Sequence, residues 1–154
     1  MPELVVYVDR SNVNPGKLEE LKEAVKELAT FVEANEPRLI GYHVYFNEES
    51  TLMSVVHVHP DAASLAWHME VIGPLMPRFA DLVTMQSIDV YGSPDDDVRD
   101  RLQQKARTLG GGRVAVHRLH AGVRRLPGGG WAGGGVALAH EAPAGASPGA
   151  PADR

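Results

Sequence analysis

Apolar residues along the first part of the chain recur with the two spacings that distinguish strands from helices. Residues 4–9 are apolar on both alternating faces, which is typical of a strand in a sheet that is covered on both sides. A helix is expected to follow, with Asn14 as its N-cap and Pro15 in its first turn. Its apolar stripe runs to about Asn35 and consists of Leu18, Leu21, Val25, Leu28 and Val32. The pattern therefore predicts a strand followed by an amphipathic helix.

The same periodicities predict a hairpin, a second helix and a fourth strand. Residues 39–46 and 52–59 are expected to form two strands around a polar turn. A helix should run from Asp61 to about Gly73, with a further turn before a strand at residues 85–91. The predicted order of elements is therefore βαββαβ.

The chain beyond Gly92 changes character twice. A third helix is expected to start at residues 93–96 and to end at the glycines 110–112, with a short strand at residues 113–118. From Pro127 onward, 20 of 28 residues are Gly, Ala or Pro, so the segment buries too little apolar surface to offset its ordering entropy. We therefore expect a core domain at residues 1–92, a helix-and-strand extension at 93–126 and a disordered tail at 127–154.

A βαββαβ chain folds most simply as a ferredoxin-like α+β domain, in which both helices cover one face of an antiparallel four-stranded sheet. The other face is then bare, although the first strand is apolar on both sides. Such an exposed patch is larger than soluble monomers normally tolerate, so a second copy of the chain is the simplest cover. The expected assembly is a homodimer with its sheets packed face to face, a dimeric α/β barrel. Space left between sheet and helices would be the ligand pocket.

Composition and charge exclude several classes of function. The chain has no cysteine, which rules out disulfides, thiolate zinc sites, iron–sulfur clusters and a cysteine nucleophile. Its 15 Lys and Arg against 20 Asp and Glu give a net charge of -5, which offers nucleic acid phosphates no broad cationic surface. No apolar run approaches the roughly 20 residues of a membrane-spanning helix, and residues 1–3 lack the basic start of a signal peptide. We expect a cytoplasmic protein that binds neither nucleic acid nor membrane.

Several segments of residues 4–92 together resemble one known family. They are Leu4-Val-Val-Tyr-Val, Pro15-Gly-Lys-Leu-Glu-Glu-Leu, Asn35-Glu-Pro, Gly41-Tyr-His-Val-Tyr, His59-Pro-Asp-Ala, Leu65-Ala-Trp-His68 and Ile88-Asp-Val-Tyr-Gly92. This succession is similar to the antibiotic biosynthesis monooxygenase (ABM) domain. The resemblance implies oxygenation of quinols, anthrones or related polyphenols by molecular oxygen, without a flavin, haem or metal cofactor. Other relatives degrade haem or have no demonstrated reaction.

His68 is the candidate catalytic residue. It shares a helical stripe with Leu65, Met69 and Ile72, so its ring should point toward the sheet and the expected pocket. A neutral imidazole there can take a phenolic proton and leave an electron-rich anion that reacts with oxygen, because the substrate itself supplies the electrons. The alternative is a buried histidine that hydrogen-bonds a backbone carbonyl or a carboxylate.

Further histidines lie in the hairpin, and the faces that they occupy depend on the length of its turn. An odd number of turn residues groups the polar side chains on one face, where they would orient a polyphenol in the space between the sheets. These side chains are His43, Tyr45, His57 and His59, joined by Asp89 and Tyr91. Three histidines with Asp89 are also potential ligands of a divalent metal, but no fixed ligand spacing is present, so no metal is expected. An even number of turn residues separates His43 from His57 and weakens both ideas.

Trp67 lies on a neighbouring stripe of the second helix, where it would either pack on a partner surface or flank an aromatic substrate. With the family resemblance, the sequence predicts a cofactor-independent monooxygenase that acts on a small aromatic quinol or polyketide-like substrate with molecular oxygen. His68 would accept the proton. The expected substrate contacts are His43, Tyr45, His57, His59, Trp67, Asp89 and Tyr91. The alternatives are a non-catalytic dimer of the same fold that binds a small molecule or haem, and a dimerisation module.

Overall fold

The structure, a computed structural model, describes residues 3–125 of the 154-residue chain. Residues 3–120 belong to one compact unit and residues 121–125 to a second; the expected disordered tail lies outside the described residues. The elements of the first unit are β1 (Val5–Val13), α1 (Leu18–Asn35), β2 (Gly41–Phe46), β3 (Leu52–His59), α2 (Ala62–Ile72), the 3-10 helix η1 (Gly73–Phe79), β4 (Val83–Tyr91), α3 (Asp96–Thr108) and β5 (Arg113–His117).

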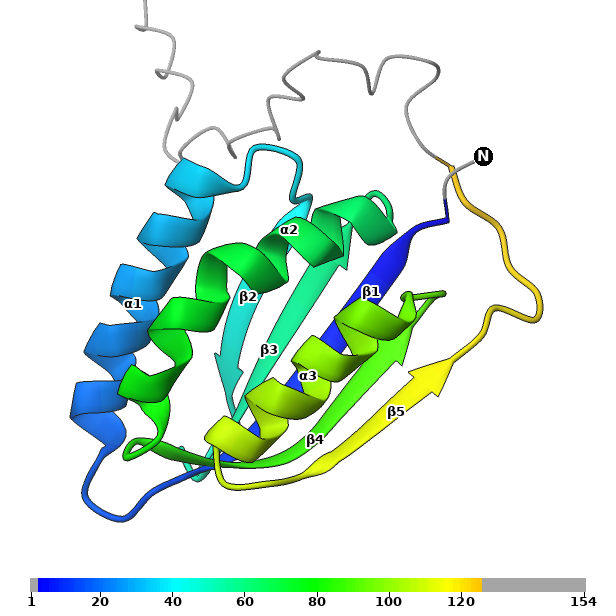
Figure 1. Cartoon of the computed structure of the whole chain (residues 1–154). Helices are drawn as coiled ribbons and strands as arrows, with labels where there is room; N and C mark the ends of the chain where they lie inside the picture. The colour runs from blue at the N-terminus through cyan, green and yellow to red at the C-terminus, as the bar shows by residue number, and fades with distance from the viewer. Residues whose placement is uncertain (1–2, 126–154) are drawn as a thin grey trace, which may run out of the picture. The chain divides into compact units, whose positions relative to one another are not determined.

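The strands form a five-stranded sheet in the order β2-β3-β1-β4-β5. Strands β1 to β4 pair antiparallel in the order that a ferredoxin-like chain produces, which confirms the predicted α+β class and the βαββαβ succession. The predicted four-stranded, wholly antiparallel sheet is wrong, because β5 adds a fifth strand parallel to β4. A parallel neighbour requires a crossover connection, which α3 supplies. Figure 1 shows all three α-helices on one face of the sheet.

Strand β1 continues past its predicted end at Asp9 and reaches Val13. Its buried, helix-facing side carries Val5, Tyr7, Asp9 and Ser11. Apolar alternation stops at Asp9, so the pattern alone ends the strand there. In the structure the strand continues through its pairing with β3 and β4, and Lys105 pairs with the buried carboxylate of Asp9.

Helix α1 begins at Leu18 and not after an Asn14 cap, so that prediction is wrong. Gly16 has a φ of 73°, a left-handed conformation that interrupts a helix and that glycine adopts without strain. Asn14 instead donates its side-chain amide to the Asp81 carbonyl at 3.0 Å and accepts from the Thr84 hydroxyl at 2.7 Å. Its side chain therefore ties the connection between β1 and α1 to the start of β4.

Helices α2 and α3 lie within the residues expected for them, and each is capped by an aspartate. Asp61 accepts a hydrogen bond from the backbone of Ser64 at 2.9 Å, and Asp95 accepts one from Val98 at 2.8 Å. These caps set where each helix starts and thereby which side chains face the sheet. Within residues 3–125, no helix combines the length and apolarity that a membrane span requires.

The core lies between the helices and the side of the sheet that they cover. Its fully buried side chains include Leu21 and Val32 of α1, Leu65 and Ile72 of α2, Leu102 of α3 and Ile88 of β4. On the uncovered face, Val6 pairs with Val58 and Val8 with Val56, and all four are partly buried. Residues 5–8 of the first strand are therefore apolar on both faces, as predicted, whereas its later residues are not.

Leu102→Ala tests whether α3 is integral to this core. Leu102 is fully buried, so its truncation leaves a cavity and should lower the free energy of unfolding by about 2–5 kcal/mol. Urea unfolding measures the change, and Gln103→Ala at an exposed position of the same helix is the control. Equal stability of the two variants would contradict an integral role for α3.

Candidate functional site

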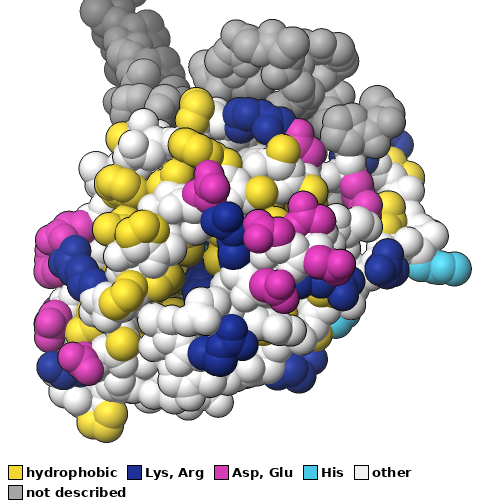
Figure 2. Space-filling view, viewed as in Figure 1, with side chains coloured by type: hydrophobic (Ala, Val, Ile, Leu, Met, Phe, Trp, Pro, Cys, Tyr) yellow, Lys and Arg dark blue, Asp and Glu magenta, His cyan; other side chains and the backbone are white. Residues whose placement is uncertain are grey.

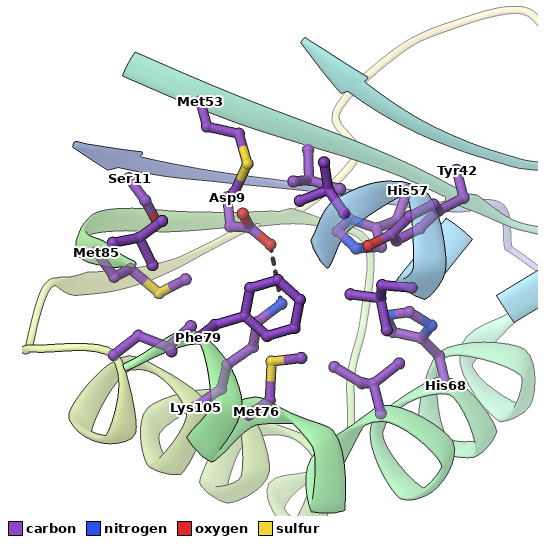
Figure 3. Close-up of a pocket in the computed structure, with 16 residues that line it drawn as sticks. Asp9, Ser11, Tyr42, Met53, His57, His68, Met76, Phe79, Met85 and Lys105 are labelled. Atoms are coloured by element: carbon purple, nitrogen blue, oxygen red, sulfur yellow. Dashed lines mark hydrogen bonds and ion pairs between the residues drawn. The ribbon is translucent and has the colours of Figure 1, made fainter. Parts of the chain in front are cut away.

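A small cavity lies between the covered side of the sheet and the helices (Figure 3). Its volume is about 30 Å³, whereas a single water needs roughly 10–15 Å³, so the cavity has room for water but not for an aromatic ring. Its apolar wall includes Phe79 and three methionines, whose flexible side chains repack readily. Its polar lining consists of Asp9, Ser11, Tyr42, His57, His68 and Lys105.

A wider groove lies on the surface between α2, η1 and α3. Its volume is about 560 Å³, and Pro74 and Arg101 are among the residues that line it. Figure 2 shows this helical side hollowed, with hydrophobic and charged side chains around the hollow. Met76 and Lys105 line both the groove and the cavity. These two side chains therefore form the boundary between the surface and the interior space.

His68 and Glu36 form a buried pair. Glu36 directly follows the last residue of α1, and His68 faces the sheet from α2, as its helical stripe predicts. The His68 Nδ1 atom lies 2.8 Å from each carboxylate oxygen of Glu36. Its Nε2 atom is buried and has no hydrogen-bond partner among the described residues. The carboxylate therefore orients the ring, and the other nitrogen of this cavity-lining residue stays buried and uncommitted.

Burial also sets the protonation of this pair. It raises the pKa of Glu36 to about 7 and lowers the pKa of His68 to about 3, with the charge of Lys105 adding to the lowering at His68. The imidazole is therefore neutral near pH 7. When Glu36 is ionised it accepts the Nδ1 proton, so Nε2 keeps a free lone pair. When Glu36 is protonated it donates to Nδ1, and the ring proton moves to Nε2.

A buried ion pair joins α3 to β1 at the cavity wall. The Lys105 Nζ atom lies 2.9 Å from Asp9 Oδ2 (Figure 3). It also donates to the hydroxyl of Tyr7. Burial raises the pKa of Tyr7, and the neighbouring carboxylate of Asp9 raises it further. Burial likewise raises the pKa of Tyr42. Both tyrosines therefore remain hydrogen-bond donors at neutral pH.

His57 and His59 complete a cluster of buried histidines on the covered side of β3. The His57 ring stacks on Tyr7 with centroids 3.7 Å apart, and its Nδ1 donates to the Tyr7 carbonyl at 3.1 Å. His59 Nδ1 lies 2.8 Å from the Ser64 hydroxyl. Burial lowers the pKa of both histidines, that of His59 to about 3. These lowered pKa values leave the cluster neutral near pH 7. The rings are also closely packed, because the centroid of the His68 ring lies 4.8 Å from that of His57 and 5.4 Å from that of His59.

The hairpin turn has an even number of residues, so the grouping of polar side chains expected for an odd turn is wrong. Residues 47–52 connect the paired ends of β2 and β3. The Asn47 side chain closes this turn by accepting two backbone N–H groups, each at 2.8 Å. His57 consequently faces the helices, whereas His43 and Tyr45 are exposed on the uncovered face of the sheet.

Asp89 and Tyr91 also lie on the uncovered face. Asp89 accepts from His117 Nε2 at 2.8 Å and pairs with Arg10 at 3.5 Å, while Tyr91 stacks on His117 with centroids 4.7 Å apart. The histidines considered with Asp89 as metal ligands are thus divided between two faces. In the part of the chain that the structure describes, no three histidine or acidic side chains are placed to hold a metal ion.

Trp67 occupies the outer side of α2. It is 52% exposed, and its Nε1 donates to the carbonyl of Asn35 at 3.1 Å. Of the residues predicted for the site, His57 and His68 line the cavity and His59 lies beside them. Trp67 and the residues of the uncovered face do not join them.

Charged and hydroxyl groups that the sequence pattern does not single out complete the site: Tyr7, Asp9, Glu36 and Lys105. Two of these residues could have been recognised from their positions in the sequence. Asp9 continues the inward alternation of β1, and Lys105 falls on the buried stripe of α3 with Leu102. An acid and a base at inward positions of two elements are typical of a buried ion pair. Glu36 carries no such signal because it lies past the periodic part of α1.

Similarity to known proteins is found among solved structures, and it concerns the fold. No protein-family model and no curated protein matches the chain. MupZ from Pseudomonas fluorescens is 19% identical, with a TM-score of 0.62 over 80% of this chain and 95% of that protein. The matched 80% of this chain is longer than residues 1–92, so the structural similarity extends into the segment of α3 and β5.

Two further solved structures cover the smaller core. Rv0793 from Mycobacterium tuberculosis is 15% identical, with a TM-score of 0.52 over 61% of this chain and 98% of that protein. A protein from Bacteroides thetaiotaomicron described as a "putative antibiotic biosynthesis monooxygenase" is 18% identical, with a TM-score of 0.51 over 61% of this chain and 90% of that protein. The chain therefore has an ABM-like α+β fold, enlarged by a helix and a fifth strand.

Proposed function

We propose that this protein is a cofactor-independent monooxygenase that oxidises a small aromatic quinol or a polyketide-like phenol with molecular oxygen. The observation that carries the proposal is the buried Nε2 of His68, which has no hydrogen-bond partner among the described residues, on a residue that lines the cavity and whose Nδ1 is held by Glu36. The ABM-like fold supports it, because a solved structure that shares this fold is described as a "putative antibiotic biosynthesis monooxygenase".

In the proposed reaction, His68 starts the chemistry by removing a proton. The substrate O–H bond breaks, an Nε2–H bond forms, and the carboxylate of Glu36 stabilises the resulting imidazolium. The electron-rich anion then supplies electrons directly to oxygen. For a quinol, the substrate loses two hydrogens and gains one oxygen atom, and the second oxygen atom leaves as water. The substrate provides all the electrons, so the balance requires no further reductant.

Substrate entry requires the cavity to enlarge. Met76 separates the cavity of about 30 Å³ from the groove of about 560 Å³, and methionine side chains change rotamer at low cost. In this proposal, rotation of Met76 joins the two spaces and admits an aromatic ring from the side of α3. Phe79 then offers a ring face against which the substrate packs.

The proposed assembly is a homodimer formed through the uncovered face of the sheet. This face carries the partly buried valines of β1 and β3, together with Tyr45 and Tyr91, which are 54% and 45% exposed. A second copy would cover this surface. His43 and Asp89 would then lie at the interface between the copies, and the substrate would bind on the other side of the sheet.

The size of the cavity favours one alternative, a dimer of the same fold that performs no chemistry. A space of about 30 Å³ has no room for haem and admits an aromatic molecule only after rearrangement. Oxygen uptake in the presence of a quinol panel distinguishes the two functions, since turnover requires both substrate entry and the base.

His68→Ala should lower the rate of oxygen uptake with a quinol at least tenfold, because the variant lacks the group that accepts the proton. An oxygen electrode measures the rate, and His120→Ala, at an exposed position outside the sheet and the cavity, is the matched control. Unchanged turnover in His68→Ala would remove this residue from the mechanism.

The rate should rise with pH through about 7 in the wild type, because ionisation of Glu36 frees the Nε2 lone pair of His68. In Glu36→Gln the rate should no longer rise with pH near 7, since the amide oxygen of Gln accepts the Nδ1 proton at every pH. The measurement is kcat against pH for both proteins. A variant that retains the same rise near pH 7 would show that another group controls it.

A further inference from the structure

We propose that Lys105 is a further residue of the site, which binds the substrate oxygen as an anion once His68 has taken its proton. The inference rests on the proposed function and adds the ionisation state in which the ligand binds. The site would take small phenols and hold them in their phenolate form. The observations that carry it are the hydrogen bonds of Lys105, its place on the cavity wall and the position of α3.

The ammonium group of Lys105 has a donor to spare. An ammonium carries three N–H donors, and its acceptors among the described residues are Asp9, at 2.9 Å, and the hydroxyl of Tyr7. The side chain is almost fully buried, yet it lines both the cavity and the groove. The third N–H group is therefore available to a molecule that enters past Met76.

Packing alone does not require a charge at this position. The other buried residues of α3 are apolar, including Val98, Leu102 and Ala106. A buried ion pair costs desolvation, and well-packed apolar residues of similar volume are often equally stable or more stable. The pair of Lys105 and Asp9 instead places a fixed cation beside the cavity. Asp9 holds that cation in position from the central strand.

The two functional groups approach the cavity from different helices. Figure 3 shows His68 and Lys105 projecting from α2 and α3 toward the sheet, with the ion pair to Asp9 marked. Proton transfer to His68 leaves a negative charge on the substrate oxygen. A charge-assisted hydrogen bond from Lys105 stabilises that charge strongly in a site from which water is excluded. The proton thus goes to Nε2, and the oxygen stays bound to Nζ.

The test uses 4-nitrophenol, whose phenolate absorbs visible light and whose neutral form does not, and 4-nitroanisole, which has no proton to lose. Both are titrated into the wild-type full-length protein and into Asp9→Asn/Lys105→Met. The double substitution removes the cation without leaving an unpaired buried carboxylate. Circular dichroism and thermal unfolding confirm that it folds, and Asp9→Asn alone retains the cation as a reference.

The wild type should bind nitrophenol as the phenolate, and the double variant should bind the phenolate at least tenfold more weakly. Binding of 4-nitroanisole should be the same in both, which shows an intact cavity. Equal phenolate binding by the two proteins would overturn the proposal, as would a wild type that binds no phenolate.

Oxygen uptake with quinols is measured separately. If the protein binds phenolate through Lys105 but consumes no oxygen, only the monooxygenase function is contradicted. If Asp9→Asn/Lys105→Met consumes oxygen at the wild-type rate, only the role of Lys105 is contradicted.

Discussion

The hydrogen bond between Glu36 and His68 is the interaction on which the proposed chemistry of this molecule depends. A carboxylate removed from water is costly without a partner, and the end of α1 places this one 2.8 Å from an imidazole on α2. The contact satisfies one ring nitrogen, orients the ring and leaves the other nitrogen buried without a partner in residues 3–125. Because the same contact joins two helices that cover the sheet, the packing of the fold and the placement of the base have a common origin.

A second buried charge explains why the domain is larger than a four-stranded core. Asp9 faces inward from the central strand, and Lys105 of α3 neutralises it. Removal of one partner from such a pair typically costs about 3–5 kcal/mol, so α3 belongs to the structural core and brings β5 into the sheet beside β4. The cavity lies where this ion pair and the pair of Glu36 and His68 meet flexible methionines. Its volume of about 30 Å³ means that the proposed function requires it to enlarge before a ligand enters.

Local patterns in the sequence predict much of this arrangement and miss the contacts between distant residues. The stripe of α2 predicts that His68 faces the sheet, because helical periodicity alone determines that direction. The register of the hairpin depends on the even length of residues 47–52, which the hydrogen bonds of Asn47 stabilise and which periodicity does not reveal. Glu36 lies 32 residues from His68, and Asp9 lies 96 residues from Lys105. Such pairs become visible only when the elements pack together.

The tautomer of His68 is the property that tests this account most directly. Nitrogen-15 NMR of histidine-labelled protein, with His68→Ala to assign the signals, reports which ring nitrogen carries the proton. Above the pKa of Glu36, near 7, the account predicts a proton on Nδ1 and a bare Nε2, with the proton moving to Nε2 as the pH falls. A ring that holds its proton on Nε2 at every pH, or that is an imidazolium throughout, would contradict the assignment of His68 as a base.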